Sequence, residues 1–366
     1  AQASAPGRAG VAVIRISGPQ AFVIAQEITG KRPEGRESAL RNLRGTGGEV
    51  IDQALVLSFP GPNSFTGEDV VEFQLHGSIA VMRAMLSLLS TFPETRMAEA
   101  GEFTRRALEN EKLDLAQVEG LADLIEAETE AQRKQALRVL SGHLGARVED
   151  WRKDLIRAAA LLEATIDFAD EEVPVDVTPE VEALLSKVGK ELQAEAEGTY
   201  VAERVRNGFE VAIIGAPNVG KSSLLNALAG RDAAIVAETA GTTRDVIEVY
   251  LDLGGFAVLV ADTAGLRETE DAIEREGVRR ARARAEDADI VIAMLDATAG
   301  EPEMHIERKL LGDNAVVAIN KIDLRRPKSP LEIAGHQAME ISVTTGEGIE
   351  RLFETTRNRV AERFAV

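Results

Sequence analysis

The sequence predicts a multidomain α/β protein with an N-terminal α+β domain, a helical domain, and a C-terminal domain built on a mostly parallel, doubly wound sheet. Short β-rich runs alternate with helix-like stretches up to about residue 111. Strand signals then vanish from 113 to about 205, where apolar residues recur every three or four positions. From Phe209 onward, apolar strands alternate with helices. The expected domains span 1–111, 112–206 and 207–366.

Composition narrows the class of protein. The chain has 366 residues, of which 45% are hydrophobic and 28% charged, so two or three domains can each bury a core. A net charge of −19 disfavours a general polyanion binder. Cysteine is absent and no apolar run reaches about 18 residues. We therefore expect a cytoplasmic protein with no membrane partner, disulfide or thiolate metal site.

The N-terminal region combines strands and helices. The runs "VAVIRIS" (11–17), "ALVLSF" (54–59) and "VVEFQL" (70–75) are rich in β-branched residues, which is typical of strands. Helix-like stretches lie between them, and "PGPNSFTGED" is a turn sequence. The predicted helices cover 20–28 and 79–90.

The middle region predicts amphipathic helices whose apolar stripes need a partner. After an acidic break, Thr178 is expected to cap a helix that has Pro179 at its first position. Residues at helical spacing define the predicted stripes: Leu121, Leu124, Ile125, Trp151, Leu155, Ala159, Leu162 and Ile166.

The third region contains apolar strands that suit a sheet buried on both faces: "FEVAIIG", "FAVLVAD", "DIVIAML" and "NAVVAIN". The first is followed by "GAPNVGKSS". In this pattern, Gly215 and Gly220 let backbone amides approach phosphates, and Lys221 reaches the β- and γ-phosphate oxygens. The alternative, a glycine-rich helix start, weakens because other nucleotide motifs follow. The expected binding residues are Asn218, Val219, Gly220, Lys221, Ser222 and Ser223, with Ser222 on magnesium.

Two further segments suit a triphosphate and its metal. "DTAG" ends a strand and places Asp262 near magnesium and the Gly265 amide near the γ-phosphate, with Thr263 and Ala264 between them. In "AETAGTTRDV", Thr243 rather than Thr242 is the better candidate to complete magnesium coordination. A loop threonine in a turn is the alternative.

The motifs "NKID" and "SVT" indicate which nucleotide base the site binds. The Asp323 carboxylate can accept both guanine N–H groups, whereas adenine would leave it unpaired. Asn320 is expected to bond the ring and the backbone, and the Lys321 stem to lie against the ring face. A backbone amide of "SVT" would meet the guanine carbonyl. The sequence therefore predicts a GTP or GDP site that includes Ser342, Val343 and Thr344.

These motifs, together with "APGRAGVAVIRISGP", "PGPNSFTGEDVVEFQLHG", "NEKLDLAQVEGLADLI" and "DTAGLRETEDAIEREG", resemble the tRNA-modification GTPase family MnmE, also called TrmE. The resemblance covers essentially the whole chain. It implies a folate-binding-like N-terminal dimerisation domain, a helical domain and a P-loop GTPase domain. It also implies a homodimer whose GTPase domains meet face to face in potassium, and a flavoprotein partner, MnmG. The pair modifies the wobble uridine of tRNA with a one-carbon unit from 5-formyltetrahydrofolate or a related tetrahydrofolate.

The resemblance also explains Leu266, which stands where many GTPases have a water-orienting glutamine. It implies that Glu274 orients the water and that Asn218 and the loop 237–242 hold K⁺, a cation that can replace an arginine finger. By the residues alone, Glu274 is more naturally an exposed carboxylate at a helix start. The implied loop ligands of K⁺ are Ala237, Thr239 and Thr242.

In the N-terminal domain, the resemblance assigns folate contacts to Arg15, Glu72 and Lys112. A basic group suits the glutamate tail of a folate and a carboxylate suits the donor edge of a pterin, and which residue does which stays open. Without the resemblance, each is an ordinary surface charge. We expect His76 at a strand end rather than in catalysis. A solvated face is the default for a run of arginines, with an acidic neighbour or tRNA as the alternative: Arg275, Arg279, Arg280, Arg282 and Arg284.

Two alternatives remain open at this stage. Relatives in the family continue into further helices and a cysteine motif, so we expect either a piece of a longer protein or a variant without the terminal step. The functional alternative to a potassium-stimulated GTPase in tRNA modification is a GTP-dependent switch or assembly module, for example in ribosome maturation. An RNA-reading domain with a basic GXXG loop or stacking aromatic residues would favour this alternative. Only 4% of the residues are aromatic and the sequence shows no such loop.

Overall fold

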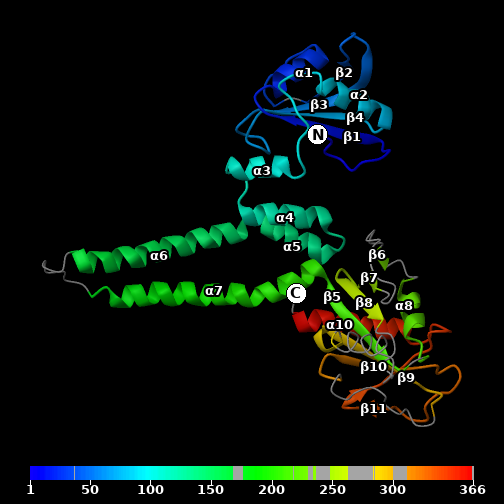
Figure 1. The fold of residues 1–366 in the computed structure, drawn as a ribbon. Helices are drawn as coiled ribbons and strands as arrows, with labels where there is room; N and C mark the ends of the chain where they lie inside the picture. Colours follow the sequence, from blue (N-terminus) through cyan, green and yellow to red (C-terminus); the bar gives the residue numbers. More distant parts are fainter. Residues whose placement is uncertain are drawn as a thin grey trace, which may run out of the picture. The chain divides into compact units, whose positions relative to one another are not determined.

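A computed structural model describes most of the chain as two compact units, Ala1–Glu119 and Gly120–Val366 (Figure 1). No helix in the described part of the chain is both long and apolar enough to cross a membrane. The domain boundaries expected at 111 and 206 remain a prediction. The described residues are 1–36, 38–167, 176–216, 218–229, 234–235, 248–262, 283, 285–299 and 311–364.

The first unit is a four-stranded antiparallel sheet with helices on one face. Its strands lie in the order β1 (Val11–Ser17), β4 (Val70–His76), β3 (Val50–Phe59) and β2 (Ser38–Arg44). Side chains alternate along each strand. The inward set, which includes Ile14, Val56 and Phe73, packs against α1 (Ala21–Thr29) and α2 (Ile79–Leu89). The outward set of β1 and β4 includes the directly paired residues Arg15 and Glu72.

The predicted strands and helices of this unit are confirmed, and one strand was missed. "SALRNLR" forms β2, but only Leu43 of its seven residues is buried. An edge strand with polar and basic residues has too little apolar alternation to stand out in the sequence. A third helix, α3 (Glu102–Glu109), follows a loop and carries the charged side chains discussed below.

Four helices follow: α4 (Leu115–Glu126), α5 (Glu130–Leu140), α6 (His143–Asp167) and α7 (Thr178–Asn207). Helices α6 and α7 run side by side (Figure 1). They are antiparallel, because Trp151 Nε1 donates to Glu191 Oε2 (2.7 Å) while Lys187 pairs with Asp154 (2.8 Å).

The apolar stripe predicted on α6 is wrong after Trp151. Leu155 and Leu162 are 43% and 47% exposed, and Ile166 is 74% exposed. Helix α6 contacts α7, and its buried residues Trp151 and Ala158 are seven positions apart, as in a coiled coil. Ile125 of α4, also in a predicted stripe, is exposed. The buried or half-buried residues of this part of α6 are 151, 154, 158, 161 and 165.

The predicted start of α7 was also wrong by one residue. Thr178 is the first helical residue rather than the N-cap, and Pro179 follows it in the first turn. The Asp176 side chain accepts a hydrogen bond from the Thr178 amide (3.0 Å), so an aspartate supplies the oxygen that was expected from the threonine.

The nucleotide-binding motifs lie on a seven-stranded sheet. All its pairings from β13 to β8 are parallel, and β8–β7 and β7–β6 are antiparallel, so the predicted mostly parallel fold class is confirmed. A separate two-stranded hairpin is formed by β11 (Glu332–Ile333) and β12 (His336–Gln337). The spatial order is β13 (Met339–Glu340), β10 (Ala315–Asn320), β9 (Ile290–Asp296), β5 (Phe209–Gly215), β8 (Ala257–Asp262), β7 (Glu248–Asp252) and β6 (Ala234–Ile235).

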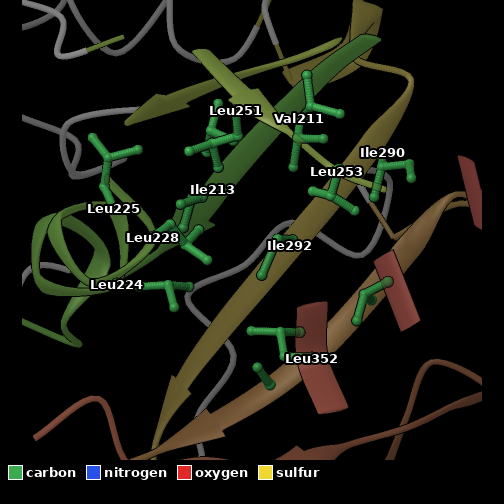
Figure 2. Packing of buried hydrophobic residues seen from close by; sticks show 14 of the residues in the cluster. Val211, Ile213, Leu224, Leu225, Leu228, Leu251, Leu253, Ile290, Ile292 and Leu352 are labelled. Carbon is green, nitrogen blue, oxygen red and sulfur yellow. The ribbon is translucent and has the colours of Figure 1, made fainter. Parts of the chain in front are cut away.

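Both faces of this sheet are buried. Val211 and Ile213 of β5 point to one face, where Figure 2 shows them with Leu224 and Leu225 of α8 (Lys221–Ala229). Helix α10 (Ile349–Phe364) also packs on this face. The alternate residues of β5 point to a second cluster on the other face. This two-sided core fixes the carboxyl ends of the strands, where the ligands of such sheets bind.

The helices are attached to the sheet within the second unit. Val205 of α7 belongs to the same core cluster as β5. Arg204 pairs with the buried Asp289 (3.3 Å), which also accepts a hydrogen bond from the Glu210 amide. At the start of α5, the Ala131 amide donates to the Gly255 carbonyl (3.0 Å).

Candidate functional site

The phosphate-loop motif connects the end of β5 to the start of α8, as the sequence predicts for a phosphate cradle. Gly215 has φ 152°, and an added Cβ would lie 2.5 Å from the Met294 carbonyl oxygen. Gly220 has φ 106°, and its added Cβ would lie 2.4 Å from Nδ2 of Asn320. A side chain at either position would therefore be strained and would collide with its neighbours.

Lys221 is buried at the first turn of α8, with 7% of its surface exposed. Its Nζ donates to the carbonyl oxygens of Gly215 (3.0 Å) and Ala216 (3.1 Å), so the ammonium group is held over the loop. A cation beside the amino-terminal end of a helix creates a local attraction for an anion such as phosphate.

The remaining loop residues differ in accessibility. Asn218 is exposed and has φ 63°, a conformation that asparagine tolerates better than most residues. The Val219 side chain is buried, so only its backbone groups can contact a nucleotide. Ser222 and Ser223 are exposed in the first turn of α8, where a hydroxyl can reach a bound metal.

Asn320 joins the base-recognition motif to the phosphate loop. It ends β10 with only 3% of its surface exposed. Its Nδ2 donates to the Val219 carbonyl oxygen (2.8 Å), and its Oδ1 accepts from the Val343 amide (3.0 Å). One buried side chain therefore connects three of the motifs predicted to bind the nucleotide.

A hydrogen bond from a buried serine, Ser342, orients the Asp323 carboxylate. Ser342 Oγ donates to Asp323 Oδ1 (2.6 Å) and accepts from the Thr345 amide (3.2 Å). The Ser342 side chain is buried, whereas Asp323 and Thr344 are exposed. The arrangement leaves the carboxylate at the surface in a fixed orientation, which suits recognition of two adjacent N–H donors.

Asp296, the last residue of β9, belongs to the site although no sequence motif pointed to it. Its Oδ2 pairs with Lys321 Nζ (2.6 Å), and Lys321 has φ 68°. Burial acts to raise the pKa of Asp296, but hydrogen bonds from Lys321 and Thr298 outweigh it and hold that pKa below its usual value. The sequence did contain one clue. Asp296 ends the strand that runs parallel to the strand ending in Asn320, so the two residues lie at the same edge of the sheet.

The expected magnesium, potassium and catalytic residues are only partly described. Asp262 ends β8, whose register places it beside Ile213 of β5. The arginine run beyond residue 274 also lies outside the described residues. The other predicted site residues outside them are Ala237, Thr239, Thr242, Thr243, Thr263, Ala264, Gly265, Leu266 and Glu274.

The first unit brings together two of the three residues expected to contact folate. Arg15 Nε and Nη2 both lie 2.7 Å from Glu72 Oε1, and the two side chains are 25% and 17% exposed. Lys112 lies after α3, where its Cε would be 3.0 Å from a Cβ added to Gly67. His76 ends β4 as expected, and its ring bonds Asp52 (2.8 Å).

Two family models together match most of the chain. The family model "GTP-binding protein TrmE N-terminus" matches residues 1–112, and "MnmE helical domain" matches residues 115–364. The chain belongs to the MnmE family of tRNA modification GTPases. MnmE of Dinoroseobacter shibae is 58% identical over 100% of this chain and 82% of its own length. MnmE of Roseobacter denitrificans is 59% identical over 98% of this chain and 81% of its own.

Two solved structures each resemble part of the chain. Era of Aquifex aeolicus, bound to GDP.AlF4-, is 29% identical over 41% of this chain and 56% of its own, with a TM-score of 0.33. The G domain of the FeoB iron transporter of T. maritima is 28% identical over 43% of this chain and 99% of its own, with a TM-score of 0.34. The assignment to the MnmE family therefore rests on the family models and the MnmE relatives.

Proposed function

We propose that this MnmE chain hydrolyses GTP to support modification of the wobble uridine of tRNA. The observation that carries the GTPase half is the position of Asn320 between the Val219 carbonyl and the Val343 amide. This contact connects the base pocket to the phosphate loop. It would therefore fix the position of the triphosphate relative to the guanine base. Fixed placement of the reacting phosphate is a large part of catalysis in phosphoryl transfer.

Guanine selectivity would come from Asp323. Its Oδ1 is held by Ser342, and the carboxylate can accept from the ring N–H and the exocyclic amine of guanine. Adenine has an unprotonated N1 and no amine at C2, so it leaves the carboxylate without either donor, at a cost of about 1–3 kcal/mol or more. Lys321, held by Asp296, would place its stem against the ring face.

The residues present also fit the expected cations. Ser222 and Thr243 would hold Mg²⁺, and Asn218 with Ala237, Thr239 and Thr242 would hold K⁺. Bound there, the two cations supply positive charge to the phosphate oxygens. The exposed Asn218 amide on a positive-φ turn has an oxygen available for a monovalent cation. Glu274 is proposed to orient the attacking water in place of the glutamine that Leu266 replaces.

The first unit is proposed to bind a tetrahydrofolate such as 5-formyltetrahydrofolate. Arg15 uses Nε and Nη2 on a single oxygen of Glu72. Within the described part of the chain, Nη1 of Arg15 and Oε2 of Glu72 have no protein partner. The guanidinium can donate to the oxo group of a pterin edge, and the carboxylate can accept from the N–H groups of that edge. Lys112 then suits the glutamate tail.

The remaining parts of the proposal follow from membership of the family. They are a homodimer, a flavoprotein partner equivalent to MnmG, a tRNA substrate and a cytoplasmic site of action. The three-part division at 1–111, 112–206 and 207–366 also belongs to this proposal, with the folate site in the first part and GTP in the last.

Base exchange tests the proposed GTP site. Asp323→Asn replaces an acceptor with a donor, so the variant should lose GTP affinity and gain affinity for xanthosine triphosphate, whose ring offers an oxo group there. Fluorescence titration with labelled nucleotides measures both affinities. Unchanged GTP affinity in the variant, or equal affinity of the natural chain for GTP and ATP, would contradict the proposal.

A further inference from the structure

The environment of Arg15 contains two aromatic rings that the folate assignment does not use. The Arg15 guanidinium carbon lies 5.5 Å from the centre of the Phe65 ring and 5.4 Å from that of Phe103. Phe65 comes from the loop between β3 and β4, and Phe103 from α3. Rings at these distances attract a guanidinium group, so they restrict where Arg15 can point while it pairs with Glu72.

The loop that carries Phe65 is fastened at the next residue. Thr66 is fully buried, its hydroxyl bonds Ser17 Oγ (2.7 Å), and its carbonyl accepts from Asn110 Nδ2 (2.6 Å). Phe65 itself is 36% exposed, so it is less tightly enclosed than a core residue. The hydrogen bonds of Thr66 therefore help to fix the backbone from which the Phe65 ring extends.

Arg106 of α3 links this loop to the helix that carries Phe103. Its Nη1 donates to Glu68 Oε2 (2.8 Å), which also accepts from Ser17 Oγ (2.8 Å). Its Nη2 donates to Glu102 Oε1 (2.6 Å). Glu102 is buried and is held in turn by Arg96 and by the Glu99 amide. One guanidinium thus joins the loop to a fixed point on α3.

We propose that Arg106 is a positioning residue for the Arg15–Glu72 site. It acts through Glu68 to hold Phe65 opposite Phe103, and the two rings keep Arg15 in the orientation in which it pairs with Glu72. The ligand class is a planar heteroaromatic ring with adjacent donors and an acceptor. This inference rests on the proposed folate site and adds the residues that preorganise it.

The test is calorimetric titration of the whole chain with 5-formyltetrahydrofolate. Arg106→Ala should weaken binding by about tenfold or more, the size of one lost charge-assisted contact. The matched control is Arg105→Ala. Arg105 is the next residue of α3 and is 54% exposed, with pairs only to Glu99 and Glu109 in the described structure, so its loss should change affinity less than about twofold.

A double-mutant cycle separates positioning from a general loss of stability. If Arg106 acts through Glu68, then Arg106→Ala with Glu68→Ala should bind no more weakly than Arg106→Ala alone. Losses that multiply would overturn the proposal. Phe65→Leu and Phe65→Tyr change an exposed ring without endangering the fold. Binding should fall in the first and be kept in the second, and equal binding in both would also overturn the proposal.

The outcomes distinguish this inference from the folate proposal. If the natural chain fails to bind 5-formyltetrahydrofolate, and Glu72→Gln behaves identically, the folate proposal fails and this inference fails with it. If the natural chain binds and Glu72→Gln does not, but Arg106→Ala binds as tightly as the natural chain, the folate site stands and the role of Arg106 is refuted.

Discussion

Asn320 donates its side-chain amide to the carbonyl oxygen of Val219 across 101 residues of sequence, at 2.8 Å, and both groups are buried. The contact couples the base pocket to the phosphate loop. Sequence motifs place both residues near a nucleotide, but the bond between the motifs comes from the parallel sheet, which brings the ends of β5 and β10 to the same edge.

Asn320→Ala should weaken binding of GTP and GDP alike by at least about tenfold. The change leaves the buried Val219 carbonyl without its donor and the Val343 amide without its acceptor, and each unsatisfied group costs about 1–3 kcal/mol. Titration with fluorescent GDP and GTP measures the effect. A variant that binds both nucleotides as tightly as the natural chain would show that this bond does not organise the site.

Asp296→Asn should weaken guanine-nucleotide binding by a smaller factor, about threefold to tenfold, because a neutral amide orients the Lys321 ammonium less firmly than a carboxylate does. Asp313→Asn is a suitable control, since that exposed side chain lies away from "NKID" in the turn before β10. Equal losses in the two variants would remove the specific role of Asp296. Nucleotide titration at constant ionic strength makes the comparison.

Glu102 should contribute a pH-dependent part of the stability of the first unit. Hydrogen bonds from Arg96, the Glu99 amide and Arg106 lower the pKa of Glu102 from 4.5 to about 2. Because the folded pKa is depressed, the contribution is fully present above pH 4.5 and is lost as the pH falls from there towards 2. Glu102→Gln should therefore melt lower at pH 7, and the difference should narrow in that acid range.

Calorimetric melting between pH 2 and pH 7 measures this difference. Glu99→Gln is the control, because Glu99 is 68% exposed and its pair with Arg105 is long, at 3.4 Å. A difference between Glu102→Gln and the natural chain that stays constant down to pH 2 would show that the Glu102 carboxylate is not held by its arginine partners.

Much of the fold could be predicted from periodicity. The strands of the second sheet are continuous apolar runs because both faces are covered, and the glycines of "GAPNVGKSS" mark the turn into α8. The contacts of α6 could not be predicted so well. Leu155 and Leu162 carry larger apolar side chains than Ala158, yet they are exposed and Ala158 is buried. Which of two overlapping stripes is buried depends on the partner helix, which local sequence does not specify.

The candidate site shows the same division. Glycine and lysine spacing predicts the phosphate loop, since backbone conformation is encoded locally. The roles of Asp296 and Arg106 could not be predicted because each depends on a partner brought near by tertiary structure: Lys321 on the adjacent strand for one, and Glu68 in a distant loop for the other.

Cation dependence tests the central claim most directly. The steady-state rate of GTP hydrolysis should be compared in equal concentrations of KCl and NaCl, for the natural chain and for Asn218→Ala. The proposal predicts a strong increase in potassium for the natural chain and a potassium-to-sodium ratio near unity for the variant. Equal rates of the natural chain in the two salts, or a full potassium response in Asn218→Ala, would contradict it.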